Sequence, residues 1–193
     1  EKILVERINI LGNNVTNESV IRGELLLDEG DPFTDLKLSK SISQIKARRI
    51  FADVKSKVST GSSNDLKIID ISVEEKPTGE ISAGAGIGTS GGSFMVMVTE
   101  NNWLCQGKNV SFDLDVSEES LRGSLNYVDP NYDFLGNSLN YSASSTKNDK
   151  PDQGYENTIV AAGIGTGFEQ YKDIFAKLGM NLSFDDLKTQ DSA

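Results

Sequence analysis

Two glycine-rich runs are the first residues whose types and spacing suggest chemistry. Residues 84–88 read Gly-Ala-Gly-Ile-Gly and residues 163–167 read Gly-Ile-Gly-Thr-Gly. Glycine-rich loops of this kind can bind phosphate through backbone N–H groups at the start of a helix. Neither run is followed by a helical pattern or by Gly-Lys-Ser/Thr. We therefore interpret both as strands in which small residues relieve a crowded face or permit a close approach.

Paired carboxylates suggest a second chemistry. Asp113 with Asp115, or Glu118 with Glu119, could act as the acid and base of a glycosidase. Residues two apart on a strand lie on the same face, about 6.5 to 7 Å apart. Nothing in the neighbouring sequence suggests a sugar-binding surface, so we interpret these carboxylates as part of a solvated strand face.

The histidine and cysteine content excludes several enzyme classes. The chain has no His and a single Cys, Cys105. This composition rules out His-based catalytic triads, Cys/His zinc sites and an internal disulfide. Cys105 has no His or second Cys to activate its thiol, so we expect it to be incidentally buried rather than catalytic.

The charge balance limits the partners. The 193 residues include 19 Lys and Arg against 29 Asp and Glu, a formal net charge of −10, so the electrostatic footprint of a nucleic-acid-binding protein is missing. One basic concentration comprises Lys46, Arg48, Arg49, Lys55 and Lys57. It is compatible with helix-dipole complementarity beside a solvated strand. The alternative is partner docking, for which Arg48, Arg49, Lys55 and Lys57 are the candidate residues.

The composition changes near residue 77, because residues 1–77 contain 4 Gly and residues 78–193 contain 14. The first part predicts an α+β module of the order β-α-α-β-β. Its expected elements are a strand over 4–10, a short helix capped by Thr16 or Asn17 and carrying Val20, Ile21 and Leu25, a longer helix capped by Thr34 and carrying Leu38, Ile42 and Ile45, and strands over 51–58 and 66–73.

The second part, residues 78–193, predicts strands only. Seven segments alternate between apolar and polar or glycine residues: 81–88, 94–98, 110–117, 121–127, 139–144, 160–168 and 174–184. Such strands have one apolar and one polar face, which a soluble β-sandwich or a membrane β-barrel would both produce.

Four aromatic residues favour the barrel. In an antiparallel sheet, the connections 101–108, 129–136 and 169–173 fall at one end, and they contain Trp103, Tyr132, Phe134 and Tyr171. A barrel gathers such rings in a belt at the membrane interface, whereas a sandwich has no reason to do so. We therefore predict that these four residues are interface aromatics.

The polar face supports the same interpretation. Asp113, Asp115, Arg122 and Lys177 would be costly inside a dry sandwich core but suit a water-filled lumen. Seven strands cannot close antiparallel, and eight already leave an interior only wide enough for side chains. We expect the seven strands to be part of a larger barrel.

The pairing of two of these strands can be predicted from their connection. A tight turn at Glu118 and Glu119 sets Asp115 opposite Arg122. The same register places every apolar side chain of both strands on one face, whereas a slip of one residue would place one strand's side chains on the wrong face.

Five short segments follow one another in the order typical of a POTRA domain that leads into an outer-membrane barrel. They are LVERINILGN at 4–13, RRIFADV at 48–54, VEEKPTG at 73–79, Asn101-Asn102-Trp103-Leu104 with Gly107, and Asp129-Pro130-Asn131-Tyr132. This ordered set resembles the BamA family of outer-membrane assembly factors over essentially the whole chain. The resemblance implies a membrane-proximal POTRA domain over residues 1–77 and about seven strands of a truncated transmembrane barrel over residues 78–193, where a complete barrel would have about sixteen.

The resemblance also implies a function. It indicates a non-enzymatic protein without cofactor or metal, located in the outer membrane of a Gram-negative bacterium with its POTRA domain in the periplasm. As part of a BAM complex it would insert unfolded outer-membrane proteins, with accessory lipoproteins and outer-membrane lipid as further partners and no nucleic acid. The first barrel strand would be the gate strand, carrying Gly79, Ile81, Gly84, Gly86 and Gly88, because its glycines leave a weak pairing that a substrate strand can replace.

Two other functions are compatible with the sequence. A two-partner secretion or autotransporter-assembly transporter would share the POTRA-plus-barrel layout and export a protein passenger. A soluble periplasmic binding module would require the strands to form a sandwich. The order of residues 48–54, residues 73–79 and Trp103 favours the BamA family over the transporter. The open sheet edges predict self-association of this chain.

Overall fold

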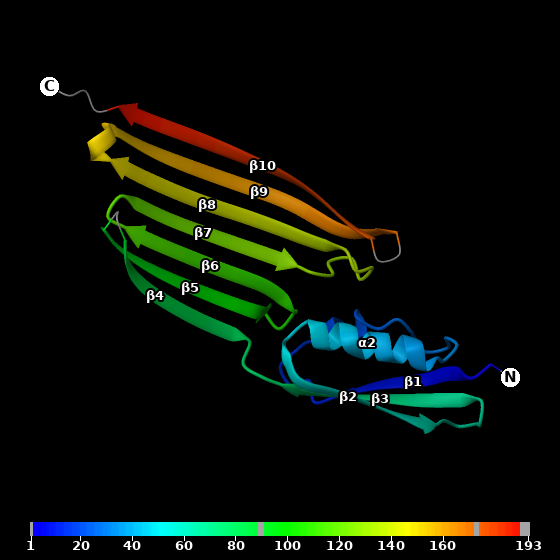
Figure 1. Ribbon diagram of the computed structural model, residues 1–193. Helices are drawn as coiled ribbons and strands as arrows, with labels where there is room; N and C mark the ends of the chain where they lie inside the picture. The colour runs from blue at the N-terminus through cyan, green and yellow to red at the C-terminus, as the bar shows by residue number, and fades with distance from the viewer. Residues whose placement is uncertain (1, 89–90, 172–173, 190–193) are drawn as a thin grey trace. The chain divides into compact units, whose positions relative to one another are not determined.

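The computed structural model describes residues 2–88, 91–171 and 174–189. They form two compact units, whose chain course is shown in Figure 1. The first unit comprises the chain up to Thr78 together with Asn101–Gly107, and the second comprises Gly79–Glu100 and the chain from Lys108 onward. None of the helices in the described ranges is long and apolar enough to cross a membrane.

The first unit has the predicted β-α-α-β-β order. Its elements are β1 (Leu4–Leu11), α1 (Glu18–Arg22), α2 (Asp35–Ala47), β2 (Phe51–Thr60) and β3 (Leu66–Glu75). The sheet has the order β1-β3-β2, with β1 parallel and β2 antiparallel to the central β3. Because β3 is central, β1 and β2 form the two edges of this sheet.

The helix starts follow the predicted capping residues. The Asn17 side chain accepts a hydrogen bond from the Ser19 N–H, and the Thr34 side chain accepts one from the Lys37 N–H. The prediction that the short helix carries Leu25 is wrong, since α1 ends at Arg22 with Gly23 as its C-cap. Leu25 lies beyond the helix but still packs against the core.

The core of the first unit joins the helices to the sheet. Alternate residues of β3, Ile69 and Ile71, are fully buried against Ile21 of α1 and Ile45 of α2. This is the pattern expected when one face of a sheet is covered and the other is left to solvent. Ile42, which lies between Leu38 and Ile45 in the predicted helical stripe, is partly buried beside them.

The second unit is one open antiparallel sheet. Its strands follow one another in space in the order of the sequence, from the β4 edge to the β10 edge. They are β4 (Gly79–Gly88), β5 (Gly91–Trp103), β6 (Lys108–Ser117), β7 (Ser120–Asp129), β8 (Ser138–Lys150), β9 (Tyr155–Tyr171) and β10 (Ile174–Thr189), with a 3-10 turn at Pro151–Gln153 before β9. All seven predicted strands are present, and they form a single sheet rather than the two packed sheets of a sandwich.

Several strands extend beyond their predicted ends. The segments 101–108 and 169–173 are predicted as connections, yet β5 continues to Trp103 and β9 to Tyr171. The strand predicted over 139–144 is also longer, since β8 continues to Lys150. Residues 172–173, which belong to one of these predicted connections, and residues 89–90 lie outside the described residues. The backbone pairing continues beyond the alternating segments. In a membrane barrel, strand ends that project beyond the lipid-facing apolar band need no apolar face.

The predicted register between β6 and β7 is confirmed. Asp115 lies opposite Arg122, and Phe112 lies opposite Leu125. Phe112 and Leu125 are exposed together on the apolar face, whereas Asp113 on the other face accepts a hydrogen bond from the Ser124 hydroxyl at 3.2 Å. The faces therefore separate as alternation requires.

The last residue of β3, Glu75, holds the loop that precedes α1. Its carboxylate accepts hydrogen bonds from the backbone N–H groups of Asn14, Val15 and Thr16, at 3.0, 3.0 and 2.6 Å. Although partial burial alone would raise the pKa of Glu75, these donors lower it below its ordinary value of 4.5. The charged form is therefore the one that stabilises the folded unit.

The register predicts a disulfide cross-link across β6 and β7. In a Cys105→Ser background, Phe112→Cys with Leu125→Cys should oxidise readily, because the two side chains lie opposite each other on one face. The control pair, Phe112→Cys with Ser124→Cys, points to opposite faces and should remain reduced. Equal cross-linking of both pairs on a non-reducing gel would contradict the register.

The Glu75 contacts predict a pH dependence of stability. Since the folded pKa lies below the unfolded one, the contribution is complete at pH 7 and is lost as the pH falls below about 4.5. Glu75→Gln should lower the unfolding free energy at pH 7 by about 2 kcal/mol and make it less dependent on acid. Urea titrations at pH 7 and pH 3, followed by Trp103 fluorescence, measure this, with the exposed neighbour Glu74→Gln as control. An unchanged acid dependence in Glu75→Gln would refute the assignment.

Candidate functional site

The predicted gate strand, β4, lies at an edge of the second sheet. It pairs with β5 along its whole length, from Gly79 opposite Glu100 to Gly88 opposite Gly91. No described strand pairs with its other side. All five predicted gate residues belong to this strand, so its outer row of backbone N–H and C=O groups is available to another strand.

The side chains of β4 give it little packing. Ile81 and Ile87 are 76% and 95% exposed on one face. On the other face, a Cβ added to Gly84 would first meet the Met95 Cγ at 3.3 Å, and one added to Gly86 would meet the Ser93 Oγ at 3.3 Å. The pairing of β4 with β5 therefore depends mainly on backbone hydrogen bonds.

The second glycine run serves a different purpose, in β9. A Cβ added to Gly163, Gly165 or Gly167 would lie only 2.7 to 2.8 Å from a polar atom of the neighbouring strand β8, namely Ser142 Oγ, Asn140 Oδ1 and Ser138 Oγ. Close approach of these polar side chains is what requires glycine here. The interpretation of the glycines as relief for a crowded face is confirmed in β9, whereas β4 is less crowded, with 3.3 Å to the nearest atoms at Gly84 and Gly86 and nothing within 4 Å at Gly88.

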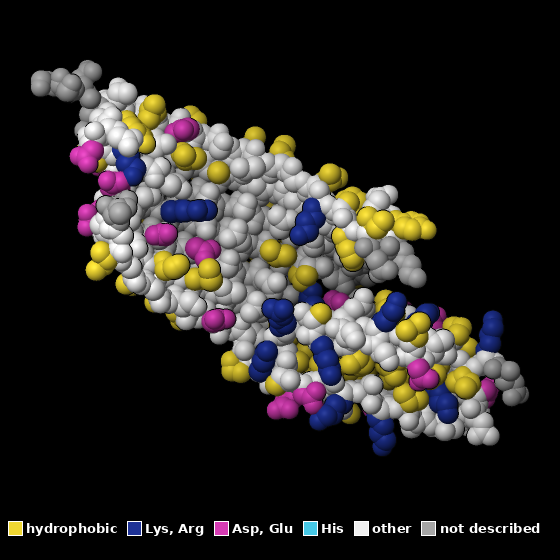
Figure 2. Space-filling model, viewed as in Figure 1, with side chains coloured by type: hydrophobic (Ala, Val, Ile, Leu, Met, Phe, Trp, Pro, Cys, Tyr) yellow, Lys and Arg dark blue, Asp and Glu magenta, His cyan; other side chains and the backbone are white. Residues whose placement is uncertain are grey.

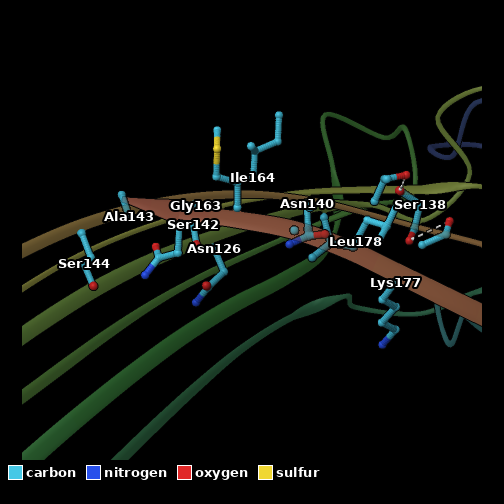
Figure 3. Close-up of a pocket in the computed structure, with 18 of the residues that line it drawn as sticks. Asn126, Ser138, Asn140, Ser142, Ala143, Ser144, Gly163, Ile164, Lys177 and Leu178 are labelled. Carbon is cyan, nitrogen blue, oxygen red and sulfur yellow. Dashed lines mark hydrogen bonds between the residues drawn. The ribbon is translucent and has the colours of Figure 1, made fainter. Parts of the chain in front are cut away.

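The polar face of the second sheet is hollowed, as Figure 2 shows. In Figure 3 the side chains of Asn126, Ser144 and Lys177 point to one side of the sheet, while Ala143 and Ile164 point to the other. The hollow is lined mainly by Asn, Ser and Gly residues of β7 to β10. This lining agrees with a water-filled lumen and offers no arrangement of a nucleophile with a base.

Next to β4, the polar face of the second sheet also carries methionine and charged side chains. Met95 and Met97 of β5 share a hollow with Asp113, Asp115 and Arg122. Of the carboxylates considered for acid–base chemistry, Asp113 and Asp115 therefore lie on an open face, opposite Ser124 and Arg122. This position supports their interpretation as lumenal residues.

The four basic candidates are not equivalent. Arg48 is only 12% exposed, forms an ion pair with Glu24 at 3.5 Å and donates a hydrogen bond to the Gly107 carbonyl at 2.8 Å. Arg49, Lys55 and Lys57 are exposed, and Lys55 pairs with Asp53 at 2.8 Å. Arg48 therefore has a structural role, and the exposed three remain the candidates for docking.

The interface aromatics occur in both units. Tyr132 and Phe134 lie in the β7–β8 connection and Tyr171 ends β9, so all three lie at the same end of the second sheet. Trp103 belongs to the first unit. All four side chains are exposed, and their role at a membrane interface stays a prediction.

The segment Asn101–Gly107 is the feature that sequence reasoning missed. It joins β5 to β6 but packs within the first unit. The buried Asn102, 9% exposed, donates to the Thr16 hydroxyl at 3.0 Å and accepts from the Gly107 N–H at 2.7 Å. The N–H of Asn17, the residue that caps α1, donates to the Cys105 carbonyl at 2.9 Å. Asn-Asn and Gly indicate a turn, but nothing local indicates where that turn packs.

This turn is held in an uncommon backbone conformation. Leu104, Cys105 and Gly107 have φ of +54°, +61° and +65°. Residues other than glycine adopt this left-handed conformation only at an energetic cost. A Cβ at Gly107 would lie 2.6 Å from the Arg48 guanidinium and 2.7 Å from the Val20 Cγ1. Cys105 is half-buried, and its backbone carbonyl rather than its thiol makes the contact described.

Comparisons with known proteins agree with this architecture. The family model for POTRA domains, a surface antigen variable number repeat, matches residues 3–76, and that for the Omp85 superfamily domain matches residues 102–193. The outer membrane protein assembly factor BamA of Neisseria meningitidis is 28% identical over 184 residues, covering 94% of this chain and 22% of that protein. BamA of Neorickettsia risticii is 26% identical over 190 residues, covering 96% and 25%.

Solved structures show the same fold. BamA from Haemophilus ducreyi lacking POTRA domains 1–3 has a TM-score of 0.82 and 24% identity, covering 98% of this chain and 37% of that one. CdiB from Escherichia coli has a TM-score of 0.70 and 13% identity, covering 99% and 38%. The chain spans about a quarter of the length of the curated relatives named above.

The fold and both family matches define a POTRA domain joined to part of an outer-membrane barrel of the Omp85 superfamily. The chain is similar to BamA proteins over nearly its whole length, and this similarity supports barrel strands in the outer membrane and a POTRA domain in the periplasm. The predicted resemblance is therefore confirmed.

The turn predicts a glycine requirement. Gly107→Ala should lower the stability of the first unit by about 2 to 4 kcal/mol, because the new Cβ clashes with Arg48 and Val20 in a left-handed backbone. Denaturation followed by Trp103 fluorescence measures this. Gly136→Ala is the matched control: its φ is +87° but nothing lies within 4 Å of the added Cβ. Equal, small effects of both changes on this transition would contradict the proposed packing.

Proposed function

We propose that this chain is part of a protein that assembles β-barrel proteins and inserts them into the bacterial outer membrane. The observation that carries the proposal is the glycine-rich edge strand β4, which pairs on one side only and has little side-chain packing. The relatives named as outer membrane protein assembly factors support it.

The chemistry of this function is hydrogen bonding. An incoming strand would pair with the free edge of β4 and replace the strand that closes the complete barrel there. Such an exchange conserves the number of backbone hydrogen bonds, and burial of the apolar face in lipid is itself favourable. The proposed activity therefore needs no cofactor, metal or catalytic residue, and the protein is an assembly factor rather than an enzyme.

The POTRA domain would receive unfolded outer-membrane proteins in the periplasm and dock accessory lipoproteins of the assembly complex. Its free strand edge suits β-augmentation of an extended chain. The exposed Arg49, Lys55 and Lys57 are the proposed docking residues for an acidic partner surface. Outer-membrane lipid would contact the apolar face and the aromatics Tyr132, Phe134, Tyr171 and Trp103.

Export of a protein passenger is the alternative function. The CdiB structures share the POTRA-plus-barrel fold, but with TM-scores of 0.70 and 0.66 and 13% identity. The BamA structure is more similar, with 0.82 and 24%. These structural similarities concern the fold alone. The assembly function is therefore supported by the sequence relatives that are named as assembly factors.

The proposed gate predicts the effect of stiffening β4. In the full-length protein, Gly84→Val with Gly86→Val adds β-propensity and contacts to Met95 and Ser93, and should slow outer-membrane protein insertion several-fold while the POTRA domain stays folded. Insertion of an unfolded barrel protein into vesicles containing the variant measures this.

Gly123→Val provides the control for the gate experiment. Gly123 lies on β7, a central strand, and nothing lies within 4 Å of its added Cβ. This variant should insert substrate at the normal rate. An unchanged insertion rate in the β4 double variant would count against a pairing role for this strand.

A further inference from the structure

The two edges of the POTRA sheet differ in how their backbone groups are satisfied. Both β1 and β2 are edge strands, and either could in principle accept an added strand. The contacts along each edge decide which of them is open.

Main-chain contacts close the first half of the β1 edge. The Val5 N–H donates to the Asp31 carbonyl at 2.9 Å, and the Val5 carbonyl accepts from the Gly30 N–H at 2.7 Å. The Phe33 N–H donates to the Ile3 carbonyl at 2.9 Å. Residues 30–33 therefore occupy the place of a neighbouring strand.

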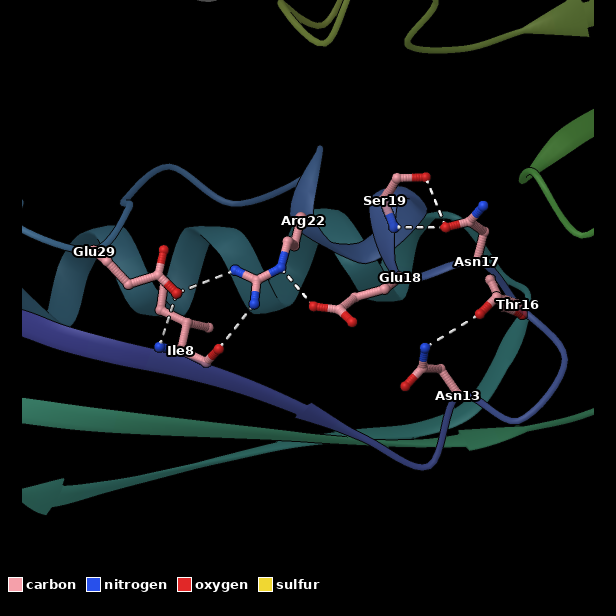
Figure 4. Close-up of polar contacts among 8 residues, drawn as sticks. All are labelled: Ile8, Asn13, Thr16, Asn17, Glu18, Ser19, Arg22 and Glu29. Atoms are coloured by element: carbon pink, nitrogen blue, oxygen red, sulfur yellow. Dashed lines mark hydrogen bonds and ion pairs between the residues drawn. The ribbon is translucent and has the colours of Figure 1, made fainter.

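Side chains close the next position of the same edge. A bulge between Val5 and Arg7 makes Ile8 the next residue whose backbone points outward. Its N–H donates to Glu29 Oε1 at 3.2 Å, and its carbonyl accepts from the Arg22 guanidinium at 3.0 Å. Figure 4 shows this arrangement, in which Arg22 also pairs with Glu29 at 3.3 Å and Glu18 at 2.6 Å. The two side chains supply one acceptor and one donor, as a partner strand would.

The side chains of Arg22 and Glu29 are both held in their charged forms. The hydrogen bond to Glu18 is the largest cause that raises the pKa of Arg22. Partial burial opposes ionisation of Glu29, but the backbone N–H donors and Arg22 lower its pKa overall. The hydrogen bonds to Ile8 are therefore charge-assisted and stronger than neutral ones.

The β2 edge is open over a longer stretch. The Gly61 N–H donates to the Leu66 carbonyl across the hairpin at 2.8 Å, and the Val54 N–H instead donates to the Asp53 side chain at 2.8 Å. In an antiparallel strand the backbone N–H and C=O groups of successive residues point alternately toward and away from the paired strand. Because the backbone of Gly61 faces β3, the backbone groups of Ser56, Val58 and Thr60 point away from it. No strand among the described residues pairs with this side.

We propose that Arg22 and Glu29 form an edge guard that prevents strand addition to β1 and directs an incoming extended polypeptide to Ser56–Thr60 of β2. On β1 only the stretch beyond Ile8 is left, which is shorter than an ordinary strand pairing. The occupant is an extended polypeptide segment, because the open edge offers a repeating row of backbone donors and acceptors. The proposal rests on the proposed function in that the POTRA domain receives unfolded chains.

The test compares strand addition at the two edges. The whole chain in detergent carries a benzophenone photocross-linker at Leu11 on β1 or at Lys57 on β2, and the probe is a fluorescent 12-residue peptide of alternating Thr and Val. In the unmodified chain, cross-linking should occur at position 57 and be at least fivefold weaker at position 11. Arg22→Ala with Glu29→Ala should raise the yield at position 11 to that at position 57.

A second measurement reports on the guard without a peptide. Hydrogen exchange at the Ile8 amide should accelerate about fivefold or more in the double variant, as expected for the loss of a charge-assisted hydrogen bond. Lys40→Ala with Asp28→Ala, two exposed residues, removes the same charges elsewhere and should leave both readouts unchanged.

The outcomes separate the guard from the proposed function. No gain of cross-linking at position 11 in the guard variant, or equal yields at both positions in the unmodified chain, would overturn the guard. Faster Ile8 exchange with cross-linking at position 11 but never at position 57 would support the guard and overturn the assignment to β2. Normal edge selectivity with failed membrane insertion would refute the proposed function alone.

Discussion

The backbone hydrogen bond at a strand edge is the interaction on which this structure depends. Every strand in a sheet presents N–H and C=O groups on both sides, and an edge leaves one row without a strand partner. The second sheet has two such edges, β4 and β10, and the first has β1 and β2. The backbone groups of an edge strand can be satisfied by another backbone segment, by side chains or by an incoming partner. This difference separates the structural edges from the functional ones.

Glycine acts on this constraint in opposite ways in the two runs that the sequence shows. In β9, polar side chains of β8 lie so close that a Cβ would clash with them, so glycine there strengthens the packing of two central strands. In β4 the nearest neighbours of an added Cβ are single side-chain atoms of Met95 and Ser93 at 3.3 Å, and the absence of side chains lowers the cost of separating this strand from its neighbour. The same glycine spacing thus stabilises one pairing and weakens another, and the neighbouring strand decides which.

The elements and the register could be predicted from the sequence because they depend on local alternation and turns. Asp115 faces Arg122 since a short turn and one apolar face leave a single consistent pairing. The strand ends were predicted less well, because β8 and β9 continue into residues that have no apolar face. The contacts of Glu75, Arg22 and Asn102 could not be predicted, since each joins a side chain to residues distant in the sequence, up to 86 positions for Asn102 and Thr16.

The position of Asn101–Gly107 in the first unit has a consequence for how such proteins can be recombined. The POTRA domain is continuous in space but is assembled from two separate stretches of sequence, the chain up to Thr78 and this turn. A chimera that exchanges only the first stretch would join Thr16, Asn17 and Arg48 of one protein to the turn of another. The two segments should therefore be exchanged together, because substitutions in one of them constrain those that the other tolerates.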